Sequence, residues 1–239
     1  MSDYEERSAG SKSSKKSKSK VVSPATPKKP AANINLVEDE LPDQIIFPDK
    51  KAPWHNPLNR WTNKPKWEAK EIEAQIILKI PPKTDCWRKT RHNFIMDNAP
   101  YNWHKVTGDF EVMVKISGNF SNMYDKAGLM IRVDPENWLL SGLEYFNDRV
   151  HHSTSVTVDY TEWSLSQLPV GAEEVGVWFC VKRLGNTYEC FYSFDCRTWV
   201  QTRQGIFTDR PTLQVGICGA CPLGNELEVC FDGYRVDPL

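Results

Sequence analysis

Several aromatic and charged residues of the sequence are of types that recognise small polar molecules. Trp and Tyr rings stack on the apolar faces of sugars, and Arg, Asp and Glu form hydrogen bonds with hydroxyl groups. The alternative is an ordinary role in the core or in internal ion pairs, and a shared face for Arg132 and Glu144 would favour a site. Arg183 and Arg203 belong to the same group near strand ends. The candidate ligand-binding residues are Trp87, Arg88, Tyr124, Asp125, Arg132, Trp138, Glu144 and Trp163.

A carbohydrate-active enzyme would need two carboxylates that face one glycosidic bond. Glu144 and Asp125 are the candidates for this pair, although they lie on separate segments of the chain. The sequence lacks the Glu-x-Asp-x-x-Glu string that is typical of β-sandwich glucanases. A hydrolase or lyase that uses Glu144 is therefore the alternative to a binding module without catalysis.

The seven cysteines and five histidines indicate no metal or redox site. Cys218 and Cys221 have the spacing of a zinc half-site or a redox pair, but no second Cys-x-x-Cys follows, and a redox pair normally opens a helix. The odd number of cysteines, without a secretory signal, predicts reduced and mostly buried thiols. We interpret His151 and His152 as loop residues without function, and we predict no metal and no cofactor.

The elements that must position these residues are β-strands, because apolar and polar residues alternate with a period of two along most of the chain after residue 54. Only Lys66 to Leu78 has the spacing of an amphipathic helix, and even there residues 76–80 are typical of a strand. Many short strands favour an all-β, two-sheet jelly-roll sandwich. The predicted strands cover residues 111–116, 127–133, 138–145, 156–158, 175–181, 187–193, 213–218, 227–231 and 234–236.

The first 50 residues differ from the rest of the chain in composition. The whole chain has a formal net charge of -1, but residues 1–30 contain eight basic and three acidic residues, which gives them +5 and the remainder -6. Such a segment buries too little apolar surface to offset the entropy of ordering it. We predict a disordered basic tail and acidic linker over residues 1–50, in which residues 45–47 could dock as an edge strand, and one domain over residues 51–239.

The basic tail suggests functions of its own. The Lys-rich residues 11–20 are interpreted as a nuclear address or a contact with anionic surfaces, with a merely solubilising tail as the alternative. Ser23 and Thr26 precede prolines and are candidate phosphosites. We expect at most weak polyanion contact by residues 1–30, because the near-neutral chain excludes a uniformly basic nucleic-acid binder. Neither a membrane span nor a secretory signal is predicted, so we expect a cytoplasmic protein, with a nuclear location as the alternative.

Seven short motifs follow one another along residues 54–236. They are Trp54–Pro57, Thr84–Arg88, Asp109–Glu111, Tyr124–Arg132, Trp138–Glu144, Glu162–Ser164 and Cys221–Pro222. In this order they resemble the regulation-of-enolase family, a domain of unknown function in the concanavalin A-like lectin/glucanase superfamily. The resemblance implies a concanavalin A-like jelly roll in a cytoplasmic protein linked to carbohydrate metabolism. It also implies that Asp125, Arg132 and Glu144 belong to the site.

The sequence departs from this family's pattern at four positions. The family usually has an aromatic residue where Cys86 stands, Gln in place of Lys126, Lys in place of Leu140 and Asp in place of Glu162. The missing lysine removes a cation that could pair with Glu144. If the family site is catalytic and uses that lysine, we expect this chain to be inactive or altered.

The sequence thus predicts a non-catalytic binding or regulatory module. Its expected partner is a saccharide or a protein, with enolase as the named possibility. The three tryptophans of the candidate set would stack on the ligand, its two carboxylates would accept hydrogen bonds, and Arg132 would orient those carboxylates. The alternatives are the carbohydrate-active enzyme and a structural subunit of a larger assembly.

Overall fold

The computed structural model describes residues 56–66 and 70–239. The predictions for the basic tail and the acidic linker, with the phosphosites Ser23 and Thr26 and the edge strand at residues 45–47, lie outside the described residues. The expected domain boundary therefore stays a prediction.

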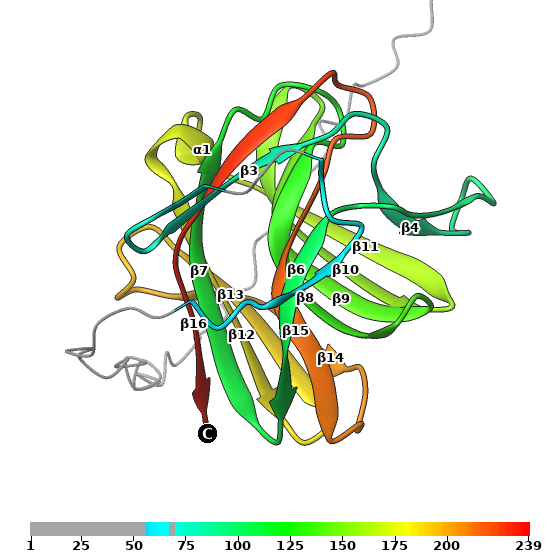
Figure 1. Cartoon of the computed structure of the whole chain (residues 1–239), viewed down its shortest axis with the longest axis vertical. Helices are drawn as coiled ribbons and strands as arrows, with labels where there is room; N and C mark the ends of the chain where they lie inside the picture. Colours follow the sequence, from blue (N-terminus) through cyan, green and yellow to red (C-terminus); the bar gives the residue numbers. More distant parts are fainter. Residues whose placement is uncertain (1–55, 67–69) are drawn as a thin grey trace, which may run out of the picture. The chain divides into compact units, whose positions relative to one another are not determined.

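Two seven-stranded sheets pack face to face, and all neighbouring strands within them are antiparallel (Figure 1). Sheet A has the spatial order β1 (Arg60–Thr62), β6 (Tyr101–Thr107), β15 (Thr212–Ala220), β8 (Lys126–Asp134), β9 (Asn137–Phe146), β10 (Arg149–Val158) and β11 (Tyr160–Gln167). Sheet B has the order β14 (Val200–Ile206), β13 (Thr187–Ser193), β12 (Val177–Leu184), β7 (Phe110–Gly118), β16 (Leu227–Pro238), β3 (Gln75–Ile80) and β2 (Lys70–Ile72). The predicted all-β, two-sheet sandwich is confirmed, whereas the narrower concanavalin A-like assignment stays a prediction.

The main hydrophobic core lies between the two sheets. Alternate residues of β8 and β9, such as Leu129, Ile131 and Leu139, meet Val114 and Phe179 of sheet B, and all five are at most 1% exposed. Full burial of a side chain of this size contributes about 1.5–3 kcal/mol. The apolar residues that recur at every second position in the sequence are therefore those that face this core.

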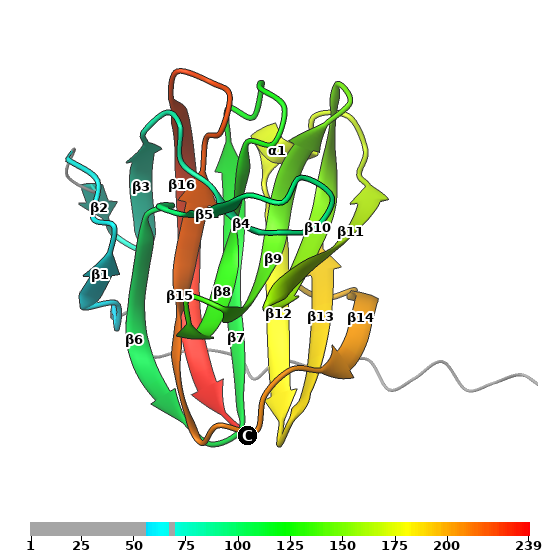
Figure 2. The ribbon, with the colours of Figure 1, turned by 90° about the vertical axis from the view of Figure 1, so that its right-hand side faces the viewer.

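A short hairpin covers part of the outer face of sheet A. Its strands are β4 (Cys86–Arg88) and β5 (Ile95–Asp97), and Figure 2 shows them crossing in front of the strands of sheet A. Cys86 of the hairpin packs in a second apolar cluster with Tyr101, Met130 and Trp138. Because both faces of β8 and β9 are covered here, these strands are apolar on both sides.

The sequence pattern misses several strands: β1, β2, β4, β5, β6, β11 and β14. Of these, β11 and β14 lie at the open edges of the two sheets. An edge strand has one side in solvent and needs few apolar residues, so the alternation is weak. Glu162 of β11 and Arg203 of β14 form an ion pair of 3.0 Å between the two edges.

Two of the sequence-based expectations are wrong. The helical spacing over Lys66 to Leu78 does not give a helix in the described part, since β2 and β3 form there. The interpretation of His151 and His152 as loop residues fails because both lie within β10, where His152 points between the sheets and is 2% exposed. The only described helix is α1 (Ala172–Val175). No helix in the described part of the chain has the length and apolar character needed to cross a membrane.

Candidate functional site

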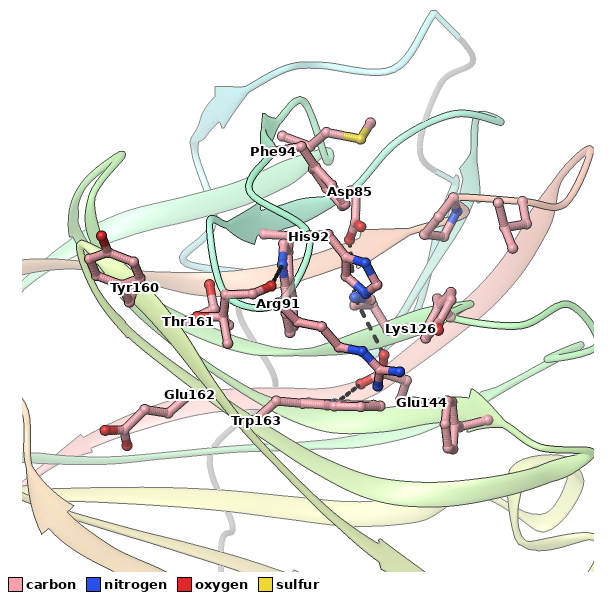
Figure 3. A pocket seen from close by; sticks show the side chains of 17 residues that line it. Asp85, Arg91, His92, Phe94, Lys126, Glu144, Tyr160, Thr161, Glu162 and Trp163 are labelled. Carbon is pink, nitrogen blue, oxygen red and sulfur yellow. Dashed lines mark hydrogen bonds and ion pairs between the residues drawn. The ribbon is translucent and has the colours of Figure 1, made fainter.

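A pocket of about 550 Å³ opens on the outer face of sheet A, beside the β4–β5 hairpin (Figure 3). Its walls come from the hairpin, from the neighbouring ends of β8 and β9, from β11 and from residues 222–223. The pocket is within the size range of small-molecule sites. The aromatic residues that line it are Trp87, Phe94, Tyr124, Phe146, Tyr160 and Trp163.

Three of the charged side chains that line the pocket contact one another. Lys126 and Glu144 are opposite each other on β8 and β9, and Lys126 Nζ lies 3.4 Å from Glu144 Oε1. The same nitrogen lies 3.0 Å from Oδ1 of Asp85, which precedes β4. All three residues are at least 93% buried, and we call them the Asp85–Lys126–Glu144 cluster.

The electrostatics of this cluster keep Lys126 charged. Burial alone would lower the pKa of Lys126, but the carboxylates of Glu144 and Asp85 outweigh burial and raise it above its ordinary value. Two of the three ammonium protons have partners in the cluster. An ammonium group can donate three hydrogen bonds, so Lys126 has the capacity for one further acceptor.

The missing lysine at position 140 does not leave Glu144 without a cation. Leu140 lies on the same strand and face as Glu144, but it is buried in the second apolar cluster. Lys126 supplies the positive charge from the neighbouring strand instead. The loss of the lysine at position 140 is thus offset by Lys126.

The aromatic wall is built around Trp163. Its ring centre lies 5.1 Å from that of Phe146, 6.1 Å from that of Trp87 and 6.4 Å from that of Tyr124. Trp163 Nε1 donates to Glu144 Oε2 at 2.9 Å, and Ser153 Oγ donates to the same oxygen at 2.6 Å. These bonds fix the carboxylate and the indole relative to each other.

Four residues at the pocket or in the hairpin loop beside it have a left-handed backbone. Tyr124 has a φ of 70°, and Lys89, Arg91 and Asn93 in the hairpin loop have φ values of 57°, 65° and 51°. A residue other than glycine in this left-handed region costs about 1 kcal/mol or more. Strain of this kind persists where the surrounding structure imposes it, and it is enriched at ligand sites.

Four of the eight predicted site residues line the pocket: Trp87, Tyr124, Glu144 and Trp163. Sequence alternation places Arg132 and Glu144 on the same outer face of sheet A, as the site interpretation requires. They lie at opposite ends of this face, however, six residues apart along β8 and β9, which corresponds to about 20 Å. Arg132 therefore does not orient Glu144.

The other four predicted residues are buried outside the pocket, in structural contacts. Arg132 donates to both carboxylate oxygens of Asp97 at 2.6 and 2.7 Å and so attaches β5 to β8. Trp138 is 1% exposed in the second apolar cluster. Arg88 pairs with Glu136 at 2.8 Å and with Asp159 at 3.1 Å.

Asp125 stabilises a turn. Its carboxylate is fully buried, and Oδ2 accepts hydrogen bonds from the backbone N–H groups of Ser121 and Asn122 at 3.3 and 2.9 Å. This places the turn before β8 and, with it, the strained Tyr124. The proposed pairing of Asp125 with Glu144 at one sugar bond has no support in this geometry, since Asp125 does not line the pocket.

Apart from Trp87, sequence reasoning misses the pocket residues in and next to the hairpin. Asp85 stands inside the Thr84–Arg88 motif but is not among the predicted site residues, and Arg91 and His92 lie in the loop of a hairpin that is not predicted. The polar run of residues 88–93 next to Phe94 is the one available signal. It resembles any exposed loop until the hairpin is folded onto sheet A.

The described residues contain no group of three or more His, Cys, Asp or Glu side chains that could hold a metal ion. Cys218 and Cys221 do not act together, because Cys218 lies in the second apolar cluster and Cys221 lies in the main core. The seven cysteines form no disulfide bond with one another, and five of them are buried, as the cysteine pattern predicts.

Comparison with known proteins gives a family and several relatives. A family model described as "Protein of unknown function (DUF1349)" matches residues 61–239. The chain is 28% identical to "Regulation of enolase protein 1" of Saccharomyces cerevisiae over 176 residues, which cover 74% of this chain and 87% of that protein. An uncharacterized protein of Emericella nidulans is 29% identical over 147 residues, 58% of this chain and 66% of that protein. These matches confirm the resemblance that the motif order predicts.

Solved structures agree with the fold. The crystal structure of a functionally unknown protein from Saccharomyces cerevisiae superposes with a TM-score of 0.71 and 26% identity, over 75% of this chain and 96% of that chain. A glycoside hydrolase family GH43 protein from Bacillus licheniformis has a TM-score of 0.56 at 14% identity, over 69% of this chain and 33% of that chain. At this identity the second likeness concerns the fold alone.

Proposed function

The chain belongs to the family described as a protein of unknown function (DUF1349), and from its pocket we propose that the domain is a non-catalytic module that binds a saccharide. The observation that carries this proposal is the position of the Asp85–Lys126–Glu144 cluster beside the aromatic wall around Trp163. A sugar has apolar ring faces and a rim of hydroxyl groups, and it matches both features at once.

The hydrogen-bonding pattern of the pocket supports this ligand class. The indole N–H of Trp163 is used by Glu144, and that of Trp87 donates to the carbonyl oxygen of Thr90 at 3.0 Å. The two tryptophans therefore offer ring surfaces to a ligand. The ammonium of Lys126 offers a donor, and the neighbouring carboxylate of Asp85 offers acceptor sites, as one or two vicinal hydroxyl groups require.

The enzyme alternative receives less support from the pocket. A hydrolase or lyase that uses Glu144 needs this carboxylate to reach the substrate, but three protein donors already occupy it: Ser153, Trp163 and Lys126. A structural subunit of a larger assembly remains the other alternative, and stable co-purification of other chains would favour it.

A glycan array probed with the full chain, followed by calorimetry on the sugars retained, tests the proposal. We expect Tyr124→Leu to weaken binding by roughly five- to tenfold, because it removes one aromatic side of the pocket. Phe194→Leu is the matched control, because Phe194 is an exposed aromatic residue outside the pocket. Failure to bind any sugar, or equal losses in both variants, would contradict the proposal.

A second candidate function rests on the 28% identity with a yeast protein named for the regulation of enolase. We propose that this chain binds enolase directly. Purified enolase mixed with the full chain should give a complex by size-exclusion chromatography and a changed enolase activity. An unchanged elution volume together with unchanged activity would overturn this candidate and leave the saccharide proposal standing.

A further inference from the structure

The charged side chains that line the pocket are almost all paired within the protein. Asp85, Lys126 and Glu144 neutralise one another in part, and Glu162 pairs with Arg203 at 3.0 Å. Arg91 is the exception: it forms no ion pair and no side-chain hydrogen bond with any other described residue. A guanidinium offers five donors in a planar fork, so this site has unused capacity for a ligand.

The loop that carries Arg91 is held in place by its own backbone. Lys89 N–H donates to Phe94 at 2.8 Å, and Asn93 N–H donates to Lys89 at 2.7 Å. The left-handed residues 89, 91 and 93 alternate with ordinary ones, which makes the loop turn sharply at each of them. In Figure 3 the Arg91 side chain points from this loop into the pocket, toward Glu144 and Trp163.

We propose that the ligand of this pocket carries an anionic oxygen group, a carboxylate or a phosphate, which Arg91 binds. The inference rests on the proposed saccharide-binding function and specifies its ligand class as an acidic sugar. Arginine is suited to this role because its two parallel N–H groups match two oxygens of a carboxylate or a phosphate. Lys, a point charge, matches them less well.

The same arrangement determines how the ligand lies. The Asp85–Lys126–Glu144 cluster has two carboxylates and one ammonium, so its net charge repels an anion. The anionic group would then bind at the Arg91 guanidinium, on its side away from these carboxylates, with the hydroxyl edge of the ring toward Lys126 and Asp85. The aromatic rings around Trp163 would contact the face of the sugar between these two ends.

The test compares neutral and acidic sugars. Calorimetry on the full chain would measure D-glucose, D-glucuronate, the neutral methyl ester of D-glucuronate and D-glucose 6-phosphate, with the galacto and manno series run in parallel. We expect at least one acidic sugar to bind about tenfold or more tightly than its neutral counterpart. Comparison of D-glucuronate with D-glucose 6-phosphate shows whether the preferred anionic group is a carboxylate or a phosphate. The preference should weaken as sodium chloride rises, because Arg91 is exposed.

Variants separate this inference from the function on which it rests. Arg91→Gln should abolish the acidic preference and keep the affinity for the neutral sugar, and Arg91→Lys should retain part of the preference. Arg197→Gln, at an exposed arginine outside the pocket, is the matched control and should change nothing. Equal binding of acidic and neutral sugars, or an acidic preference that survives in Arg91→Gln, overturns the inference alone. A complete absence of sugar binding overturns it together with the proposed function.

Discussion

Lys126 on β8 and Glu144 on β9 are direct cross-strand partners, and their side chains meet at 3.4 Å in a site that is almost fully buried. The pair places two charged side chains in the pocket, next to its aromatic wall. It also defines the most sensitive point of the site, because a buried charge that loses its partner is costly.

Replacement of this lysine should strongly destabilise the domain. Lys126→Met leaves Asp85 and Glu144 as two buried carboxylates without their cation, and we expect a loss of about 3–5 kcal/mol in the free energy of unfolding. Lys126→Gln should cost less, since its amide still donates hydrogen bonds. Urea unfolding measures both losses.

The control for this prediction is Lys105→Met, which removes an exposed lysine from β6. It should change the unfolding free energy by no more than about 0.5 kcal/mol. Similar losses in Lys126→Met and Lys105→Met would show that the cluster contributes no more than a solvated charge.

Attachment of the hairpin should depend on the bidentate pair between Arg132 and Asp97. Asp97→Asn keeps the shape of the side chain but removes its charge, so the buried guanidinium loses its counterion. We expect about 2 kcal/mol of destabilisation and faster hydrogen exchange of the amides in residues 86–97. Asp148→Asn, at an exposed turn, is the control. An unchanged exchange rate in the hairpin would mean that the apolar cluster alone holds it.

Stability should fall in mildly acidic solution because of His152. Burial between the sheets lowers the pKa of His152 to about 4 from its ordinary 6.5, so the folded protein holds the ring neutral while the unfolded chain takes up a proton. The stability that the neutral His152 provides is fully present above pH 6.5. As the pH falls toward 4, the free energy of unfolding decreases progressively, by about 3 kcal/mol in all.

The contacts recorded for His152 are uncharged: the rings of Phe179 and Tyr192 and the hydroxyl groups of Ser141 and Thr154. His152→Gln should therefore flatten the pH dependence of the unfolding free energy between pH 4 and 6.5. His151→Gln, on the opposite face of β10, is the matched control. If the wild type and His152→Gln have parallel pH profiles, His152 does not carry this dependence.

The thiols should react in two groups. Cys196 and Cys230 are partly exposed, whereas the other five are buried. Of these five, two lie in the main core, two in the second apolar cluster and Cys180 in a third cluster with Met113 and Phe191. Burial raises the pKa of the Cys180 and Cys190 thiols, which lowers their thiolate fraction further. Titration of the native protein with a thiol reagent should label at most two cysteines rapidly and all seven in denaturant. Rapid native labelling of Cys218 or Cys221 would contradict the structure.

Much of the fold could be predicted from alternation. Strands such as β7 and β12 have one apolar face, and burial of that face against a second sheet is the only way to remove it from water. Edge strands such as β11 do not have this requirement, so β11 is missed although it carries Trp163. The pairing of Arg203 with Glu162 between two edges has no local signal in the sequence.

The sequence by itself determined the strands that have an apolar face, the motif order and the face on which the charged residues lie. Alternation places Lys126, Arg132, Trp138 and Glu144 together on the outer face of sheet A. Only the tertiary structure decided which of them meet a ligand. The β4–β5 hairpin folds over the end with Arg132 and Trp138 and leaves the end with Lys126 and Glu144 open. Local periodicity cannot encode this difference, because it depends on where a distant segment of chain packs.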